Sequence, residues 1–156
     1  ISEVLVDSLP FAMDKGLDLG YDGVTDEDKR RFTKVQGNPT LLKEMIRNLV
    51  DNAIHYTPST PERMGIITVR LLVDPYSKAL AVQVEDNGPG IAAAERERVF
   101  EPFYRALGSN VDGSGLGLPI VREIAQRHGA SVTVEVAHPG QALPGACFTI
   151  RFAPAG

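Results

Sequence analysis

The sequence predicts an α+β fold, a two-layer α/β sandwich with a mostly antiparallel sheet. Two observations carry this prediction. Residues 41–56 and 116–128 repeat apolar side chains at helical spacing, whereas residues 66–73 with 79–85, and 131–136 with 147–152, are short apolar segments typical of antiparallel hairpins. Helices and hairpins that mix along one chain pack as two layers around a common core.

Composition limits the possible partners. The chain has 156 residues, 43% hydrophobic and 23% charged, which suits one globular domain. A net charge of −4 without a basic run argues against nucleic acid and anionic membranes as partners. The single cysteine, Cys147, cannot form an internal disulfide. No apolar stretch approaches the ~18 residues that span a bilayer, so we expect a soluble domain, and the start at Ile1 indicates one excised from a longer protein.

The first third of the chain has the weakest patterns. Residues 2–15 place apolar side chains at roughly helical spacing, and Pro10 must bend or end a helix there. Residues 17–21 alternate apolar and polar side chains, and residues 31–35 do so more weakly. We expect these two segments to pair as strands joined by an acidic loop at residues 22–29.

Residues 41–56 form the clearest predicted helix. Asn38 is the expected cap, Pro39 lies in the first turn, and Thr57-Pro58 ends the helix. One face is apolar and would be buried, and the opposite face is a polar stripe. The stripe consists of Glu44, Asn48, Asn52 and His55.

Turn and glycine signals divide the rest of the chain. Asp74-Pro75-Tyr76-Ser77 separates the strands of the first hairpin, and a glycine-rich break at residues 86–90 follows. We expect a short helical piece around residues 92–99 and then a loop near Pro102 and Gly108. The helix at residues 116–128 ends at Gly129, and the second hairpin completes the chain.

Asn48 and Asn52 are the first candidates for chemistry. They lie four residues apart, so their amides project from one face of the helix. Such a face is usually just solvated. Asn is, however, a mediocre helix former, and its carbonyl oxygen can bind a hard cation such as Mg²⁺ that also takes phosphate and water ligands.

Two glycine-rich motifs come next. Asp86-Asn87-Gly88-Pro89-Gly90 follows a strand and is either a plain turn or a site where a carboxylate recognises an amino-bearing ring. Gly113-Ser114-Gly115-Leu116-Gly117-Leu118 opens a helix, where free N–H groups favour a phosphate chain. The second motif is no dinucleotide fingerprint, because the polar loop 108–112 precedes it instead of a strand, and it lacks the lysine of a P-loop.

An aromatic cluster lies between the two glycine motifs. Phe100, Phe103 and Tyr104 fall within five positions of a chain that has only six Phe and four Tyr, and Arg105 follows them. The cluster is either a satellite of the core under a loop or a hinged flap whose Arg105 reaches a phosphate.

In this order, the clusters resemble the N, G1, F and G2 boxes of the ATP-binding catalytic domain of two-component sensor histidine kinases. The boxes are Asn48-Leu49-Val50-Asp51-Asn52-Ala53-Ile54-His55-Tyr56, residues 86–90, residues 100–105 and residues 113–118. The resemblance runs from about residue 17 to the end of the chain. It implies the Bergerat fold shared with DNA gyrase, Hsp90 and MutL, in which helices cover one face of a mixed sheet and ATP lies between the helices and a flexible lid.

The resemblance implies a role for each box. Asn48 and Asn52 would hold Mg²⁺ and phosphate oxygens, and Asp86 would accept a hydrogen bond from the adenine amino group. Arg105 would contact the terminal phosphates from a lid at residues 105–114. The adenine ring would lie among Tyr56, Gly88, Gly90 and Ile91. The triphosphate would lie under Gly113, Ser114, Gly115, Leu116, Gly117 and Leu118.

His55 departs from the family pattern. Many of these kinases carry Lys or Arg here to hold the terminal phosphate, and His55, with Asn48 and Arg105, is expected to be catalytic. A neutral imidazole would weaken the contact, whereas a nearby phosphate favours the charged form. We therefore expect nucleotide affinity to fall as the pH rises through ~6–7.5, around the ordinary range of histidine. Equal affinities at pH 6 and pH 8 would contradict this.

Asn48 also bears on the choice between kinase and hydrolase. In the related ATPases a Glu that activates water stands at this position, and an amide is a poor general base. Glu44 lies one turn earlier, about 6 Å along the helix axis, and we expect it to be structural or to orient a neighbour. The alternatives are a nucleotide-binding conformational module or ATPase clamp without histidine phosphotransfer, and a serine kinase.

The resemblance finally implies partners. The acceptor would be a histidine on an upstream dimerisation domain, because none of His55, His128 and His138 lies in an acceptor motif. Residues 1–16 would connect from that domain, and residues 17–156 would form the catalytic domain. A response regulator would act indirectly, the fragment would be monomeric and the full-length protein homodimeric. The chain would be a cytoplasmic domain of an inner-membrane sensor.

Overall fold

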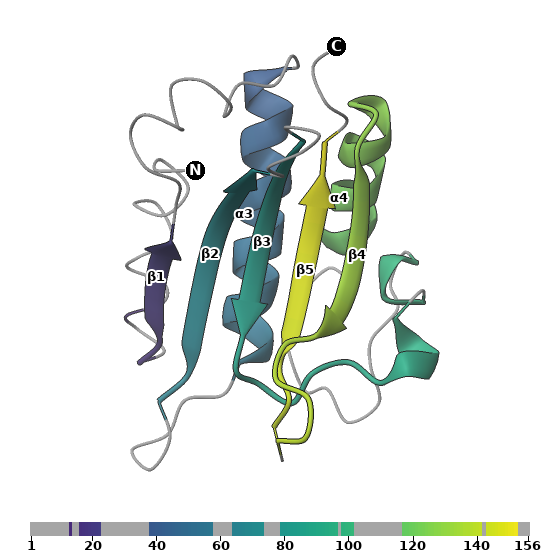
Figure 1. Ribbon diagram of the computed structural model, residues 1–156. Coiled ribbons are helices and arrows are strands. Elements are labelled where there is room, and N and C mark those ends of the chain that lie inside the picture. Colours follow the sequence, from purple (N-terminus) through teal and green to yellow (C-terminus); the bar gives the residue numbers. More distant parts are fainter. Residues whose placement is uncertain are drawn as a thin grey trace.

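The computed structural model describes residues 13, 16–22, 38–57, 64–73, 79–96, 98–101, 117–141 and 143–152. These residues form one five-stranded sheet and two main helices (Figure 1). The strands are β1 (Asp18–Asp22), β2 (Ile66–Val73), β3 (Leu80–Asp86), β4 (Ser131–Val136) and β5 (Ala146–Arg151). The helices are α3 (Pro39–Tyr56) and α4 (Gly117–Arg127), with 3-10 turns η1 (Ala93–Glu95) and η2 (Arg98–Phe100).

The sheet is mixed and mostly antiparallel. Its strand order is β1-β2-β3-β5-β4. Only β1 and β2 pair in parallel, whereas β2 with β3, β3 with β5 and β4 with β5 are antiparallel. The two predicted hairpins therefore lie side by side in one sheet, joined through β3 and β5. The predicted fold class is confirmed.

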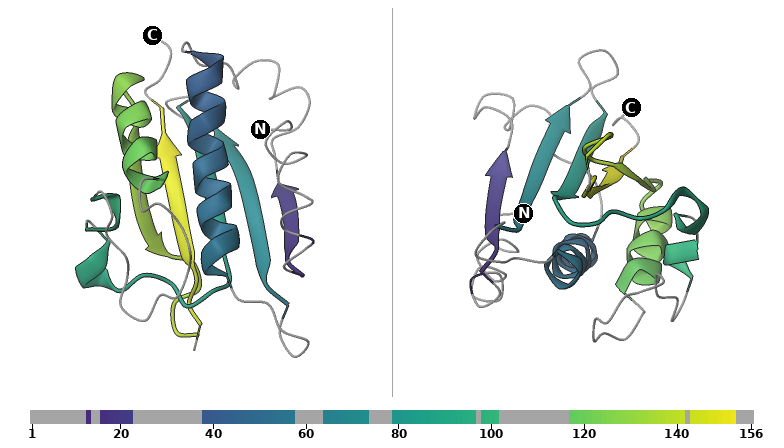
Figure 2. Two further views of the ribbon diagram at one scale, coloured as in Figure 1. Left: turned by 180° about the vertical axis from the view of Figure 1, so that it is seen from behind. Right: turned by 90° about the horizontal axis from the view of Figure 1, so that it is seen from below.

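Both helices cover the same face of this sheet (Figures 1 and 2). Met45, Leu49 and Val50 of α3 are fully buried, and they face sheet residues that are almost as well buried, among them Val84 and Ile150. Burying a large apolar side chain contributes roughly 1.5–3 kcal/mol, so the layer between helices and sheet is the main source of stability. The side chains of Arg70, Gln83 and Glu85 alternate with the buried positions and lie on the opposite face.

The helix boundaries follow the predicted signals. Oδ1 of Asn38 accepts hydrogen bonds from the backbone N–H groups of Thr40 and Leu41, at 2.9 and 3.2 Å, which caps α3. After α4, Gly129 adopts a φ of +65°, and the N–H of Ala130 donates to the carbonyl of Ala125 at 2.8 Å.

Several predicted elements are confirmed, and others differ. The helices, both hairpins and the strand near residues 17–21 are found, and the described partner of that strand is β2. The expected helical piece at residues 92–99 consists of two short 3-10 turns. Residues 31–35 lie outside the described residues, as do residues 2–15 apart from the helical Met13. None of the described helices has both the length and the apolar character needed to span a bilayer.

Candidate functional site

The two helices run antiparallel and bring three of the predicted motifs to one end of the molecule. The N–H of Asn38 at the start of α3 donates to Nε2 of His128 just after α4, at 3.1 Å. The later turns of α3 therefore lie toward the first turn of α4, which begins at Gly117. Strand β3 ends at the same end of the molecule (Figure 1). Asp86 is the last buried position of β3, on the face that alternates with the half-buried one. Asn48, Asn52 and Asp86 therefore lie toward the same end of the molecule although they are distant in sequence.

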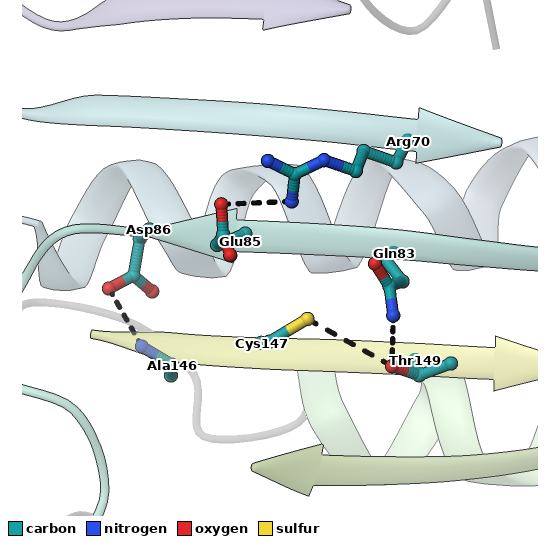
Figure 3. A network of polar contacts seen from close by, with 7 residues as sticks. All are labelled: Arg70, Gln83, Glu85, Asp86, Ala146, Cys147 and Thr149. Carbon is teal, nitrogen blue, oxygen red and sulfur yellow. Dashed lines mark hydrogen bonds and ion pairs between the residues drawn. The ribbon is translucent and has the colours of Figure 1, made fainter. Parts of the chain in front are cut away.

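Asp86 is a buried carboxylate with one oxygen already fixed. Its side chain is only 7% exposed. Oδ1 accepts the N–H of Gly88 at 2.9 Å and the N–H of Ala146 at 3.2 Å (Figure 3). Among the described residues, no donor is assigned to Oδ2. The carboxylate therefore keeps an acceptor oxygen for a ligand.

The electrostatics of Asp86 reflect two opposed effects. Burial raises the pKa of the Asp86 carboxyl above its ordinary value, while the N–H groups of Gly88 and Ala146 act to lower it. Each bond from a backbone N–H stabilises the ionised form. An acidic side chain at this depth is costly.

The turn after Asp86 is tied to strand β2 through Asn87. Oδ1 of Asn87 accepts the N–H of Ile66 at 2.8 Å, and its Nδ2 donates to the carbonyl of Met64 at 3.0 Å. Gly90 has a φ of +78°, and a Cβ there would lie 2.8 Å from the carbonyl oxygen of Gly145. The turn is therefore rigidly placed, and Ile91 packs half-buried against the core beside it.

Asn48 is oriented by its own helix. Its Nδ2 donates to the backbone carbonyl of Glu44 at 2.8 Å and to Oε1 of Glu44 at 3.3 Å. Both partners are acceptors, so the amide nitrogen must face them and Oδ1 is left to accept. Asn52, one turn later, is half-buried, and no hydrogen bond to another described residue is assigned to its side chain. The expectation that Glu44 orients a neighbour agrees with this contact.

Asp51 is a neighbour of His55 that sequence reasoning missed. It is a half-buried carboxylate one helical turn before His55. Burial raises the pKa of the Asp51 carboxyl, while the charges of His55 and Arg47 act to lower it and that of Glu44 raises it. The four-residue spacing of Asp51 and His55 was the available signal. His55 therefore has a carboxylate one turn away on its own helix.

The first aromatic residue of the cluster is part of the core. Phe100 is buried and meets Phe148 edge to face, with ring centroids 6.2 Å apart. The guanidinium carbon of Arg122 on α4 lies 5.4 Å from the centre of the Phe100 ring. Of the two alternatives for this cluster, Phe100 fits both, because an anchored Phe100 can be a core satellite and also the fixed base of a flap.

The structure leaves part of the predicted site outside its described residues. Phe103, Tyr104, Arg105 and residues 113–116, which include Gly113, Ser114, Gly115 and Leu116, belong to that part. Tyr56 is the last residue of α3, and only its backbone is described. Leu118, in the first turn of α4, is half-buried against the core.

Sequence reasoning also missed the turn between β4 and β5. Gly145 and Ala146 contact the Asp86 turn directly, through the N–H of Ala146 and through the N–H of Gly145, which donates to the carbonyl of Gly88 at 2.8 Å. Gly145 follows Pro144 directly before a strand. That pattern indicates a turn but does not indicate what the turn contacts.

Residues 37–156 match a family model described as histidine kinase-, DNA gyrase B-, and HSP90-like ATPase. The chain is 44% identical over 97 residues to the sensor protein QseC of Salmonella typhi, which covers 62% of this chain and 19% of that protein. It is 40% identical over 119 residues to the signal transduction histidine-protein kinase/phosphatase MprB of Mycobacterium sp. (strain KMS), covering 75% of this chain and 22% of that protein.

A third relative matches more of the chain. The sensor protein kinase PmrB of Pseudomonas aeruginosa is 34% identical over 142 residues, which is 90% of this chain and 27% of that protein. The chain therefore spans between 19% and 27% of the length of these three relatives.

Solved structures agree with the fold. A mycobacterial sensor histidine kinase MprB structure superposes with a TM-score of 0.79 at 29% identity, covering 97% of this chain and 94% of that one. The catalytic domain of the histidine kinase ThkA superposes with a TM-score of 0.75 at 26% identity, over 98% of this chain and 90% of that one. Full-length ShkA in complex with AMPPNP gives 0.75 at 26% identity, over 99% of this chain and 30% of that one.

Proposed function

Because the chain belongs to the family of histidine kinase-, DNA gyrase B- and HSP90-like ATPases, we propose that it is the ATP-binding catalytic domain of a two-component sensor histidine kinase. It binds Mg-ATP and donates the γ-phosphate to a histidine on a separate dimerisation domain. The observation that carries the nucleotide part of this proposal is Asp86, a buried carboxylate at the end of β3 with Oδ1 bound to two backbone N–H groups and Oδ2 left to accept.

Asp86 selects the base. An ionised carboxylate can accept hydrogen bonds but cannot donate them. Asp86 therefore recognises an amino group and disfavours a ring carbonyl at the same place. The exocyclic amino group of adenine donates to Oδ2, while Gly88 and Gly90 keep the adjacent backbone close to the ring. Ile91 supplies an apolar wall, and Tyr56 packs against the ring. The AMPPNP complex of ShkA supports an adenine nucleotide as the ligand.

Asn48 and Asn52 hold the metal and the phosphates. The contacts from Glu44 turn Oδ1 of Asn48 away from the helix backbone, and Asn52 presents its amide one turn further along the same face. Neutral carbonyl oxygens suit Mg²⁺, which keeps several sites for phosphate oxygens and water. The donor set therefore fits Mg²⁺ carried in by the triphosphate, and the metal supplies charge neutralisation on the phosphates.

Transfer depends on positioning and charge. His55 and Arg105 supply positive charge near the terminal phosphates, and residues 113–118 close over the triphosphate with the free N–H groups at the start of α4. Asn48 cannot act as a general base toward water. The γ-phosphate is therefore kept for an acceptor side chain and is not lost to hydrolysis.

The longer protein provides the acceptor. We propose that residues 1–16 connect to an upstream helical dimerisation domain, that residues 17–156 are the catalytic domain, and that the whole protein is a homodimer. The relatives that carry sensor kinase names are more than three times as long as this chain, because matches of 97, 119 and 142 residues cover only 19%, 22% and 27% of them. A response regulator takes the phosphate from the histidine, and the catalytic domain works on the cytoplasmic side of an inner-membrane sensor.

Phosphotransfer in the longer protein tests this proposal. The protein with its upstream helices is incubated with γ-labelled Mg-ATP and then exposed to acid or to alkali. Phosphohistidine is labile to acid and stable to alkali, so the proposal predicts label lost in acid, and no label in the Asp86→Asn variant. Label that survives acid would indicate a serine kinase. Nucleotide binding without any label on protein would indicate a conformational module.

A further inference from the structure

The turn between β4 and β5 donates two consecutive N–H groups to the turn at residues 86–90, where adenine is proposed to bind. The N–H of Gly145 donates to the carbonyl of Gly88 at 2.8 Å, and the N–H of Ala146 donates to Oδ1 of Asp86 at 3.2 Å. The register of β3 with β5 ends at the pair of Glu85 and Cys147. At the next position the strand contact continues through the Asp86 side chain, as Figure 3 shows.

Gly145 also lies too close to this turn for any side chain. It is buried and has a φ of +71°. A Cβ there would overlap the backbone carbonyl oxygen of Asp86 and would lie 3.3 Å from Cβ of Ala137. From the other side, a Cβ on Gly90 would lie 2.8 Å from the carbonyl oxygen of Gly145. The two turns therefore pack backbone against backbone, which only glycine allows at both positions.

We infer that Gly145 is a positioning residue for Asp86 and thereby sets the preference of the site for adenine, an inference that rests on the proposed adenine site. Gly145 touches no nucleotide in this account. It fixes the position and orientation of the Asp86 carboxylate. The N–H of the adjacent Ala146 donates to Oδ1, and the backbone of Asp86 and Gly88 packs against Gly145. The direction of Oδ2 follows from these contacts.

A displaced Asp86 carboxylate would change the selectivity of the site for the base as well as its affinity for ATP. A site built to accept a hydrogen bond rejects an analogue that lacks the donor, because the buried acceptor is then left unpaired. If the carboxylate turns away, ATP loses this bond, but an analogue without the amino group loses nothing further. The ratio of the two affinities then falls. A general loss of folded protein would lower both affinities equally and leave the ratio unchanged.

Gly145→Ala is the test variant, and Gly140→Ala is its matched control. Gly140 lies in the same connection between β4 and β5 and has a φ of +85°, but a Cβ there would meet nothing within 4 Å. The control therefore introduces the same backbone strain without the overlap at Asp86. Gly90→Ala serves as a second variant, because its Cβ meets the carbonyl of Gly145 from the opposite side.

Titration calorimetry measures the affinity of each variant for Mg-ATP and for Mg-inosine triphosphate. Inosine triphosphate carries a carbonyl where ATP carries the amino group. We expect the unaltered chain and Gly140→Ala to prefer ATP by more than tenfold. We expect Gly145→Ala, checked as folded by circular dichroism, to bind ATP at least tenfold more weakly and to lose most of this preference. If Gly145→Ala does not fold, the same loss of preference is expected for Gly90→Ala.

The outcomes separate this inference from the proposal it rests on. An unaltered chain that binds both nucleotides equally would contradict the adenine site itself. A preference for ATP that survives in folded Gly145→Ala, or in Gly90→Ala where only that variant folds, would contradict the role of Gly145 and leave the adenine site standing.

Discussion

At the scale of single residues, Asp86 combines a structural cost with a functional need. Its burial raises the pKa of the carboxyl, so the folded protein favours the neutral form more than the unfolded chain does. The stabilising contribution of the neutral form is complete below about pH 3.9, the ordinary value for Asp, and is lost as the pH rises through the higher value in the folded state. At neutral pH the ionised carboxylate therefore destabilises the fold, although the proposed recognition of an amino group requires it.

Asp86→Asn separates the cost from the function. The amide keeps an Oδ1 that can accept from Gly88 and Ala146, but it presents an NH₂ group in place of Oδ2. We predict that this variant unfolds at the same or a higher temperature than the unaltered chain at pH 7 and that it no longer binds ATP. Thermal unfolding at several pH values, together with nucleotide titration, checks both parts.

Asp86→Ala is the control for the hydrogen bonds. It leaves two buried N–H groups without an acceptor, each of which costs about 1–3 kcal/mol, so it should unfold at a clearly lower temperature than Asp86→Asn. An Asp86→Asn variant that binds ATP normally would mean that the adenine site lies elsewhere.

Alanine variants also distinguish the role of Asn48 from that of Glu44. We predict that Asn48→Ala weakens the dependence of nucleotide affinity on Mg²⁺, because one of the two proposed metal ligands, Asn48 and Asn52, is lost. Glu44→Ala should change that affinity by no more than about tenfold, because the Asn48 amide keeps its 2.8 Å bond to the backbone carbonyl of residue 44 and a single further bond contributes ~0.5–1.5 kcal/mol at most. Titrations with and without Mg²⁺ measure both effects. A Glu44→Ala variant that lost as much Mg²⁺ dependence as Asn48→Ala would contradict the minor role of Glu44.

At the scale of elements, one histidine connects the two helices that cover the sheet. Nδ1 of His128 lies 2.8 Å from the carbonyl of Ile124, which can only accept, so Nδ1 carries the proton. Nε2 is then the acceptor for the N–H of Asn38 at 3.1 Å. The neutral ring therefore links the end of α4 to the residue that caps α3.

Removal of this link should loosen the helix layer. We predict that His128→Ala lowers the free energy of unfolding by about 1 kcal/mol, the usual size of one hydrogen bond, which corresponds to ~2–4 °C in Tm for a chain of this size. Gln126→Ala, at an exposed position of the same helix, is the control and should leave Tm unchanged. Equal Tm values for both variants would show that the link contributes nothing.

The elements differ in how far sequence could predict them. The helix α3 was predictable because its cap, its first-turn proline and its apolar face are all local signals. The parallel pairing of β1 with β2 was not, because residues 23–65 separate the two strands and no local pattern encodes which distant edge a strand joins. The contact between Asp86 and Ala146 spans 60 positions and escaped notice for the same reason.

At the scale of the whole molecule, the antiparallel helices and the mixed sheet place the later turns of α3 and the end of β3 at one end of the described fold. The proposed base, metal and phosphate contacts come from the motifs, because each box is a short run of residues whose chemistry is local. What holds Asp86 in place came from the fold, since Gly145 has no chemical group of its own and acts only through the space it leaves free. The proposed ligands therefore follow from the sequence, and their positioning follows from the structure.

We propose that the chain binds Mg-ATP and keeps the γ-phosphate for a histidine that another domain supplies. Incubation of the purified chain with γ-labelled Mg-ATP, with bound nucleotide and released phosphate recorded in the same samples, tests this. We predict saturable binding with negligible release over the time in which binding is complete. Rapid release of phosphate would contradict the claim, because water would then be the acceptor and Asn48 would not prevent hydrolysis.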